Sequence, residues 1–242
     1  MNWFNELKSD FILNFVNDNR WKFITSGLKN TLIITFFSVL IGIALGMIVA
    51  VVRSSYEKNY DEMHKGVNKF FLKLANSACK IYLTVIRGTP VVVQLMIMYY
   101  IIFATSRNSL MVAILAFGIN SGAYVAEIVR SGIMSIDQGQ LEAGRSLGFD
   151  YKRTMIYIIL PQAFKNILPA LANEFIVLLK ETSVSAYIGL NDLARGGDII
   201  RGVTYSAFMP LLAVAVIYLV IVMILSAGVT KLERRLRKSD RG

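Results

Sequence analysis

The sequence is poor in residues on which several classes of protein depend. Cys79 is the only cysteine of 242 residues, which excludes a disulfide scaffold. His64 is the only histidine, so a histidine metal site or a Ser-His-Asp triad lacks its parts. No Gly-Lys pair occurs, which excludes the phosphate-binding loop G-x-x-x-x-G-K-[ST]. We therefore expect no metal site, no cofactor and no catalytic site for ATP hydrolysis.

Charge is also scarce, and hydrophobic runs take its place. Charged residues make up 17% of the chain and hydrophobic residues 55%, with a mean hydropathy of +0.54. A helix that crosses the bilayer core needs about 20 mainly apolar residues. We predict an all-α integral membrane protein with about five transmembrane helices and no soluble domain. The expected spans lie at about residues 30–52, 81–106, 108–129, 163–187 and 208–230.

The distribution of Lys and Arg indicates how the chain is oriented. With five spans and the N-terminus outside, the cytoplasmic segments hold 17 Lys and Arg and the outer segments hold 7. This split follows the positive-inside rule, whereas four spans would place both termini in one compartment. We predict an outer N-terminus and a basic cytoplasmic tail over residues 232–242. The net charge of +10 then reflects topology and not a nucleic-acid partner.

Residues 1–26 precede the first hydrophobic run and have an amphipathic pattern. Trp3, Leu7, Phe11 and Phe15 recur every four residues, with polar residues between them. This spacing predicts a helix with one apolar face, which could lie flat in the outer membrane interface. A poorly ordered tail is the alternative.

The segment between the third and fourth expected spans is more than a simple connector. Over residues 138–148 apolar and polar side chains alternate at helical spacing, which predicts a short helix with an apolar edge. Gly148 suits the position after that helix, where a positive φ costs glycine nothing. A second short helix is expected over residues 151–160, interrupted by Pro161 because proline lacks a backbone donor. The first helix could press into a groove on another protein or pack on its own chain.

This segment resembles the motif of bacterial ABC importer permeases, which reads E-A-A, three residues, G, nine residues, I-x-L-P. The matching residues are Glu142, Ala143, Gly144, Gly148, Ile158, Leu160 and Pro161. The spacing agrees throughout, and the only departure is Gly144 in place of the second alanine. That change lowers helix propensity by about 1 kcal/mol but keeps a small side chain. The resemblance implies that Gln140–Gly148 is a coupling helix, seated in a cleft of a cytoplasmic ATPase subunit.

Three further segments are similar to the polar amino acid permeases of this class. The first looks like their R-G-T-P-x-x-x-Q segment and consists of Arg87, Gly88, Thr89, Pro90 and Gln94. The others look like their third and fourth helices and lie at residues 122–133 and 168–183. Together the matches cover residues 27–231 in order, the expected transporter domain. Gly88 and Pro90 also predict a bend after Arg87.

The resemblance implies a type I ABC importer permease fold, located in the bacterial inner membrane. Two permease subunits, either identical or paralogous, would enclose the path. An ATP-binding cassette subunit would hydrolyse ATP, and an extracytoplasmic binding protein would deliver a polar amino acid. This chain would then not be an enzyme itself.

Polar side chains inside the expected spans are candidates for the path, because ionisable groups are costly at membrane depth. Helical spacing places those of the third span on one stripe. The candidates are Asn120, Tyr124 and Glu127 on the third span and Asn173, Glu174 and Glu181 on the fourth. Their carboxylates would meet a substrate ammonium group. The structural alternative is that Glu127 pairs with Arg130 and that Glu181 lies at the outer interface beside Lys180.

Two other functions fit the same features. A secondary transporter could use Glu127, Glu174 and Glu181 as a proton relay and would need no ATPase. A channel subunit or membrane scaffold would give ATP-independent flux, or none. The interpretation that we carry forward is alternating access, in which ATP binding pulls the Gln140–Gly148 helix and thereby moves the fourth span.

Overall fold

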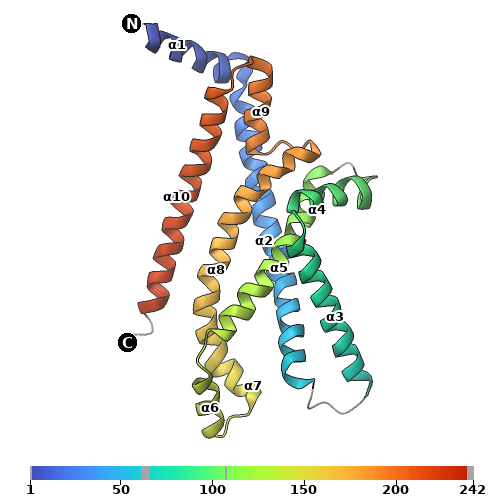
Figure 1. Ribbon diagram of the computed structural model, residues 1–242. Coiled ribbons are helices and arrows are strands. Elements are labelled where there is room, and N and C mark those ends of the chain that lie inside the picture. Colours follow the sequence, from blue (N-terminus) through green and yellow to red (C-terminus); the bar gives the residue numbers. More distant parts are fainter. Residues whose placement is uncertain (1, 61–65, 107, 239–242) are drawn as a thin grey trace. The chain divides into compact units, whose positions relative to one another are not determined.

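A computed structural model describes residues 2–60, 66–106 and 108–238, and Figure 1 shows their helices. These residues contain no strand. Four helical segments are long and apolar enough to cross a membrane: Trp21–Glu57, Ser109–Met134, Tyr151–Ile188 and Phe208–Leu236. The pair Val67–Gly88 and Val91–Ile102 makes a fifth span if it counts as one. The prediction of an all-α protein with about five spans is therefore confirmed.

The described residues form α-helices joined by short π-helical and 3-10 turns. In chain order they are α1 (Asn2–Phe11), η1 (Ile12–Val16), η2 (Asn17–Asn19), α2 (Trp21–Asn59), α3 (Val67–Gly88), α4 (Val91–Ile97), η3 (Met98–Ile102), α5 (Ser109–Met134), α6 (Gln138–Ser146), α7 (Tyr151–Thr154), η4 (Met155–Ile159), α8 (Leu160–Glu181), η5 (Thr182–Ile188), α9 (Leu193–Thr204) and α10 (Phe208–Lys238). Helix α10 thus continues into the predicted basic tail, of which residues 239–242 lie outside the described part.

The expected span over residues 81–106 is divided between two helices. Helix α3 begins much earlier, at Val67, and ends at Gly88. Thr89 and Pro90 follow with extended backbones, at ψ of 148° and 136°. Proline has no N–H to continue a helix, and it disfavours the helical conformation of the residue before it. The bend predicted after Arg87 is thus a complete break between α3 and α4.

The N-terminal residues contain the helix that their pattern predicts. Trp3 and Phe4 on α1 are 71% and 74% exposed, as expected for an apolar face without a protein partner. Asp18 then has a positive φ of 53°, which turns the chain, and α2 begins at Trp21, before the first hydrophobic run. The amphipathic helix is confirmed, and its place in a membrane interface stays a prediction.

The chain divides into two compact units, and the first holds the residues before Val39 with residues 90–117 and 176–225. Its buried hydrophobic cluster consists of Ile24, Leu193, Ile200 and Val214. A buried polar side chain, Asn14 of η1, accepts a 2.8 Å hydrogen bond from the hydroxyl of Thr204 at the end of α9. These contacts fix the N-terminal segment to α9.

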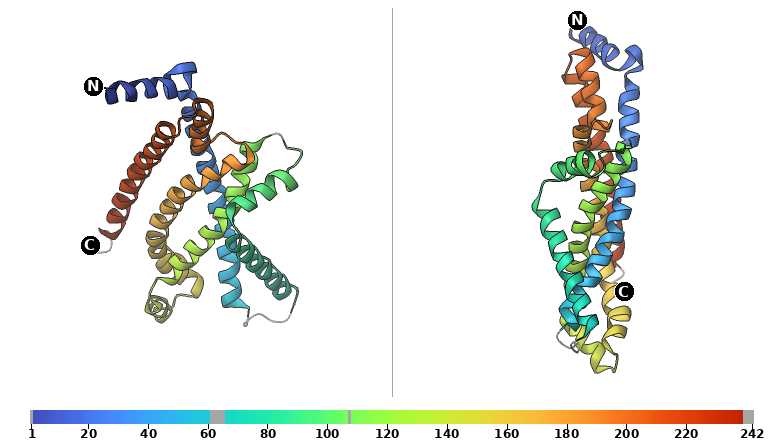
Figure 2. Two further views of the ribbon diagram at one scale, coloured as in Figure 1. Left: turned by 45° about the horizontal axis from the view of Figure 1, so that its top comes forward. Right: turned by 90° about the vertical axis from the view of Figure 1, so that its right-hand side faces the viewer.

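The second unit holds residues 39–89 and 118–175 with the end of the chain, and small residues bring its helices together. A Cβ atom on Gly42 of α2 would lie 2.8 Å from the Ser121 hydroxyl of α5, and one on Gly118 of α5 would lie 2.8 Å from Ile41. Glycine at such positions allows close packing of helices. Tyr82 of α3 adds a 2.6 Å hydrogen bond to the Ile119 carbonyl. These parts of α2, α3 and α5 can be followed in Figure 2.

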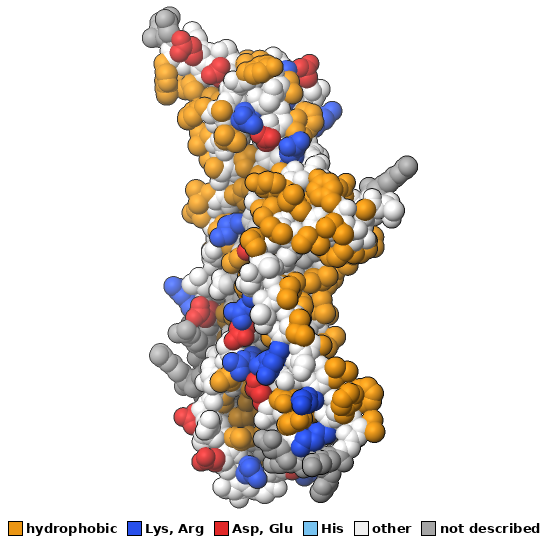
Figure 3. Space-filling model, turned by 45° about the vertical axis from the view of Figure 1, so that its right-hand side comes forward, with side chains coloured by type: hydrophobic (Ala, Val, Ile, Leu, Met, Phe, Trp, Pro, Cys, Tyr) orange, Lys and Arg blue, Asp and Glu red, His pale blue; other side chains and the backbone are white. Residues whose placement is uncertain are grey.

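The long helices expose large hydrophobic side chains to a degree that water would not favour. Ile48 and Val51 on α2 are 61% and 65% exposed, and Met223 and Ile224 on α10 are 62% and 66% exposed. Figure 3 shows hydrophobic side chains over much of the face drawn. In a soluble domain such surfaces are confined to patches of a few hundred Å². Exposed hydrophobic surface of this extent is consistent with helices that cross a membrane.

Candidate functional site

The segment between α5 and α8 begins with a short helix that has a defined start. The Asp137 carboxylate accepts a hydrogen bond of 2.6 Å from the Gly139 N–H and so caps α6. An aspartate at this position satisfies a backbone donor that would otherwise lack a partner within the helix. The short helix predicted for this segment is confirmed.

The end of α6 is closed by glycine. Gly148 has a φ of +85°, and its N–H donates to the Arg145 carbonyl at 3.0 Å. The N–H of Phe149 donates to the Gly144 carbonyl at 3.1 Å. These two bonds form a Schellman motif, in which glycine takes the left-handed conformation without steric cost. The conformation predicted for Gly148 is thus confirmed.

One side of α6 is packed and the other is exposed. Gly144 is buried, and a Cβ atom on it would lie only 2.6 Å from Thr154 Cγ2. Glu142 and Ala143 are exposed, and Leu147, which follows the last residue of α6, is 78% exposed. Helix α6 is therefore a small projection, fixed through Gly144 and open to a partner on its outer side. The departure from the E-A-A pattern is the position that allows this close packing.

The prediction that Pro161 interrupts the second short helix is wrong. The chain is helical from Tyr151 to Glu181, because α7 leads through the π turn Met155–Ile159 directly into α8. Pro161 lies in the first turn of α8, and the wider turn before it accommodates the missing N–H. The segment that follows α6 is thus continuous with the fourth span.

The polar stripe on α5 has different surroundings at each position. Asn120 is buried at 3% exposure, whereas Tyr124 is 38% exposed. Glu127, one turn further, has a half-exposed side chain that pairs with Arg87 at 3.4 Å and with Arg130 at 3.8 Å. The guanidinium of Arg87 also lies 5.9 Å from the centre of the Tyr124 ring. The alternative in which Glu127 pairs with Arg130 is therefore observed.

The path candidates on α8 also differ in their surroundings. The Ser121 hydroxyl of α5 donates a 2.8 Å hydrogen bond to the Glu174 carboxylate, which joins the two helices that carry the stripes. Asn173 is exposed. Glu181 is the last residue of α8 and belongs to the first unit. Glu174, which lies in the second unit, thus has a polar partner on α5.

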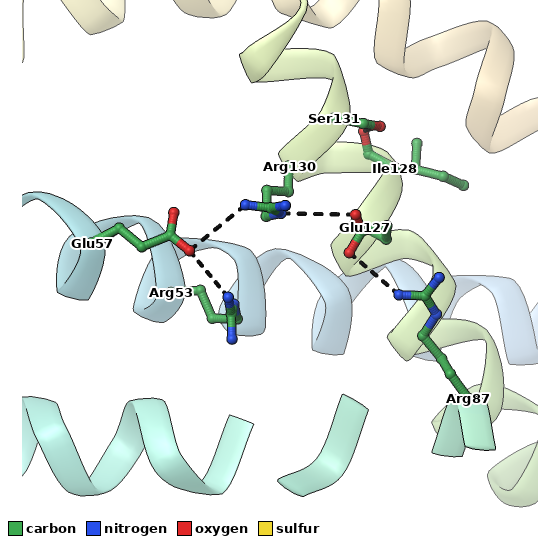
Figure 4. Close-up of polar contacts among 7 residues, drawn as sticks. All are labelled: Arg53, Glu57, Arg87, Glu127, Ile128, Arg130 and Ser131. Carbon is green, nitrogen blue, oxygen red and sulfur yellow. Dashed lines mark hydrogen bonds and ion pairs between the residues drawn. The ribbon is translucent and has the colours of Figure 1, made fainter. Parts of the chain in front are cut away.

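The pair between Glu127 and Arg87 extends into a network that joins three helices (Figure 4). The Glu57 carboxylate of α2 lies 3.0 Å from Arg53 on the same helix and 3.7 Å from Arg130 of α5. Arg130 in turn lies 3.8 Å from Glu127, which reaches Arg87 of α3. We refer to these five residues as the charge network.

Sequence analysis missed three members of these contacts: Ser121, Arg53 and Glu57. Ser121 has no charge, and nothing in its neighbourhood in the sequence marks it as the partner of Glu174. Arg53 and Glu57 lie directly after the first hydrophobic run and are four residues apart from each other. This spacing indicates an ion pair on one helix face. The other contacts depend on packing between helices. The motif residue Gln94 lies on α4, which belongs to the first unit, and Arg87 lies on α3, which belongs to the second.

Within the described part of the chain, no cluster of three or more His, Cys, Asp and Glu side chains could hold a metal ion. The arrangement has two other features that could serve a function. One is an exposed projection, α6, built onto a continuous helix. The other is a set of carboxylates on facing helices, of which Glu174 has a hydroxyl partner and Glu127 has two guanidinium partners.

Comparison with known sequences identifies a family. Residues 66–238 match the family described as binding-protein-dependent transport system inner membrane component. The chain is 38% identical over 221 residues to the arginine transport system permease protein ArtQ of Bacillus subtilis, covering 90% of this chain and 94% of ArtQ. It is 35% identical over 219 residues to the glutamine transport system permease protein GlnP of Escherichia coli, covering 88% and 93%.

Solved structures give the same result. A chain of an amino acid ABC transporter crystallised with histidines superposes with a TM-score of 0.78 at 41% identity, covering 88% of this chain and 94% of that one. The inward-facing MetNI methionine ABC transporter superposes with a TM-score of 0.74 at 20% identity, which shows likeness of fold. The predicted type I importer permease fold is confirmed.

Proposed function

Because the chain belongs to the family of binding-protein-dependent transport system inner membrane components, we propose that it forms the path for a polar amino acid in an ATP-driven importer. The arginine and glutamine permeases among its relatives support this substrate class. The proposed partners are an ATP-binding cassette subunit, a second permease subunit and an extracytoplasmic binding protein. The proposed location is the bacterial inner membrane, with the N-terminus outside.

The proposed coupling element is α6. A projection that transmits force must be rigid and exposed, and α6 has a cap at each end, a packed position at Gly144 and exposed side chains at Glu142 and Leu147. We assign coupling to the ATPase subunit to Gln140, Glu142, Ala143, Gly144, Gly148 and Pro161. In this set Gly144 and Pro161 act indirectly, because they set how α6 is held.

One observation carries the proposal: the chain is helical without a break from Tyr151, beside α6, to Glu181. Helix α6 packs against Thr154 of α7 at Gly144. Because a continuous helix moves as one body, displacement of α6 by the ATPase subunit would displace α8 and the Glu174 side chain. Alternating access then follows if the two ATPase subunits close on ATP and open after hydrolysis. The substrate would be accepted from the binding protein in the ATP-bound state.

The residues proposed for the path are Asn120, Tyr124, Glu127, Asn173, Glu174 and Glu181, of which Asn120 is buried. The ammonium group that all amino acids share would meet the Glu174 carboxylate, which a serine hydroxyl already orients. Glu127 is engaged with two arginines, so its role would be to position Arg87 and Arg130 at one end of the path.

The test of coupling is charge reversal on the exposed side of α6. In proteoliposomes with the cognate ATPase subunit and binding protein, we expect Glu142→Lys to lower substrate uptake at least about tenfold, since an interfacial contact worth about 1.4 kcal/mol is lost. The matched control is Glu6→Lys on α1, also exposed, which should leave uptake near wild type. Normal uptake by Glu142→Lys would refute the assignment of α6.

The alternative of a proton-driven secondary transporter makes an opposite prediction. The purified chain alone, in liposomes with a pH gradient and without nucleotide, should give no uptake if the proposal is right. Uptake under those conditions would establish the alternative, in which the intramembrane carboxylates relay protons.

A further inference from the structure

The first unit carries exposed aromatic side chains that the proposed function does not use. They lie on α1 and on the corner between α9 and α10, residues 203–208, at the end of the unit where α2 and α10 begin (Figure 1). Helix α1 lies crosswise to the first turns of α2 and α10 in this view. Because both of those helices belong to segments long and apolar enough to cross a membrane, a bilayer surface would lie near the level of α1.

Helix α1 has an apolar face and a polar face. At about 100° per residue, its apolar side chains fall within about a third of its circumference, and they are Trp3, Phe4, Leu7 and Phe11. The polar residue Ser9 lies on the opposite side. The Phe11 ring lies 5.2 Å from the Phe15 ring, which packs against the buried cluster of the first unit. The apolar face is thus joined to the core of the unit at one end and exposed at the other.

A buried amide fastens this segment to the corner between α9 and α10. The Asn14 side chain is fully buried, and its oxygen accepts the hydrogen bond from Thr204 described above. Its nitrogen donates to the Ser206 hydroxyl at 3.3 Å and to the Asp10 carbonyl at 2.8 Å. Breaking these bonds would leave buried polar groups without partners, which is costly. The N-terminal segment and the corner are therefore held together.

Tyr205 lies between the two corner residues that hold Asn14, in a conformation that is unfavourable for a bulky residue. Its φ is +55°, in the left-handed region that glycine or asparagine adopts more readily. Its side chain is 95% exposed, so packing within the described chain does not compensate for this conformation. Tyrosine is favoured at a membrane–water interface, because the ring contacts lipid and the hydroxyl stays in water. Contact with lipid would therefore give Tyr205 the favourable surroundings that the chain does not provide.

The exposed surface at the corner continues along α10. Phe208 begins this helix and is 69% exposed, and Leu211 and Leu212 in the next turn are also exposed. These three residues belong to the candidate span Phe208–Leu236. Because the exposed aromatic residues run directly into a surface suited to acyl chains, a lipid surface explains both together, whereas a protein partner would explain only the first.

We propose that α1 and the α9–α10 corner form one surface that lies in the headgroup region of the bilayer. We name its exposed aromatic side chains the aromatic rim, which consists of Trp3, Phe4, Phe11, Tyr205 and Phe208. The rim contacts the headgroups and the upper part of the acyl chains, and Asn14 keeps α1 at the level of the corner. The proposal requires that the chain lie in a membrane and is independent of the roles assigned to α6 and to the path.

The two tryptophans of the chain make the depth of α1 measurable. Trp21→Phe leaves Trp3 as the only tryptophan of the full-length protein. The purified variant is reconstituted in liposomes of phosphatidylcholine that is brominated either near the headgroup end or near the methyl end of its acyl chains. The apolar face of an interfacial helix lies about 5–10 Å into the boundary between headgroups and acyl chains, so we expect the first lipid to lower Trp3 fluorescence at least about twofold. The second lipid should lower it less, and iodide on both sides of the membrane should have little effect.

Two further variants place a tryptophan elsewhere in a chain that carries Trp3→Phe and Trp21→Phe. The matched control is Ser9→Trp, on the polar face of the same helix, which iodide should quench and the brominated lipids should not. Tyr205→Trp tests the corner, and the lipid brominated near the headgroup should quench it as strongly as it quenches Trp3.

Four results would overturn the proposal. Quenching of Trp3 by iodide as strong as in the Ser9→Trp chain would place α1 in water. Protection of Trp3 from iodide without quenching by lipid would show that a protein surface, such as a second copy of the chain, covers the apolar face. Stronger quenching of Trp3 by the lipid brominated near the methyl end would place α1 in the bilayer core. Quenching of Trp3 by lipid with none in the Tyr205→Trp chain would show that the corner is not part of the surface.

Discussion

Asp192 is the buried carboxylate that starts α9. Its side chain is fully buried and accepts hydrogen bonds from the N–H groups of Ala194 and Arg195. Burial raises the pKa of this carboxyl to about 6, although the two N–H donors and the Arg195 charge act in the opposite direction. The nearby Tyr218 hydroxyl, also buried, has no hydrogen-bond partner in good geometry among the described residues. The Asp192 carboxylate therefore caps α9, but burial of its charge lowers the stability of the folded protein when the carboxyl group is ionised.

This cost predicts a pH dependence of stability. An unfolded aspartate has a pKa of about 3.9, so between about pH 4 and pH 6 the folded chain holds a proton that the unfolded chain has lost. The contribution of Asp192 to the free energy of unfolding thus falls as pH rises through that window. Asp192→Asn keeps a good cap, and we expect it to stabilise the protein by up to about 3 kcal/mol near pH 8 and far less near pH 4.

The measurement for Asp192 is the melting temperature of the purified protein and the variant at both pH values. Other titrating groups are common to the two proteins, so the difference between them isolates this carboxyl. A difference in melting temperature between the protein and the variant that is equal at both pH values would contradict the raised pKa assigned to Asp192.

Gly144 departs from the E-A-A motif, and yet the packing of α6 against Thr154 requires a glycine at this position. Gly144→Ala gains about 1 kcal/mol of helix propensity, but its Cβ would collide with Thr154, which is fully buried. Overpacking typically costs about 1–3 kcal/mol, so we expect a lower melting temperature. The control is Gly202→Ala in α9, where nothing lies within 4 Å of the new atom and a higher melting temperature is expected. A rise in both variants would show that α6 is not packed tightly.

At the scale of elements, the π turn before Pro161 sets the rotation of α6 and α7 relative to α8. A π turn accommodates one residue more than an α turn, so its loss would rotate what precedes it by about 100°. Pro161→Ala restores the N–H and should let the turn relax. We expect uptake driven by the ATPase subunit to fall while the melting temperature does not, since alanine is the better helix former.

The matched control for that change is Pro169→Ala, also within α8 but not preceded by a π turn. It should keep most of the uptake. If Pro161→Ala transports as well as Pro169→Ala, the orientation of α6 does not matter for transport.

The elements that sequence analysis located are those with a local signal. Hydrophobic runs marked the spans, apolar spacing marked α1, and Gly148 marked the end of α6. The start of α3 was missed because Val67–Lys80 is amphipathic and not uniformly apolar, so it gave no hydrophobic run. The effect of Pro161 on the helix was predicted wrongly because a wider π turn can accommodate a proline that would break an α turn. The sequence contains no signal for such a π turn. Contacts such as Ser121 with Glu174 depend on which helix faces reach each other, and spacing along one helix does not determine that.

At the scale of the whole molecule, the charge network joins α2, α3 and α5 through side chains that are mostly a third to a half exposed. Ion pairs of this exposure contribute only about 0–1 kcal/mol each to stability. A network that contributes so little to folding, yet links three helices of a transporter, is expected to serve the transitions between its states. Its loss should therefore change transport more than stability.

A double-mutant cycle on Arg87 and Glu127 tests this expectation. If the pair acts as a unit, Arg87→Gln and Glu127→Gln should each lower uptake about tenfold, and the double variant should be no worse than either single one. The melting temperatures should change little, because the pair is half exposed. Losses of uptake that simply multiply would mean that the two residues act separately. Losses that follow the melting temperature would mean that the network holds the fold and has no part in transport.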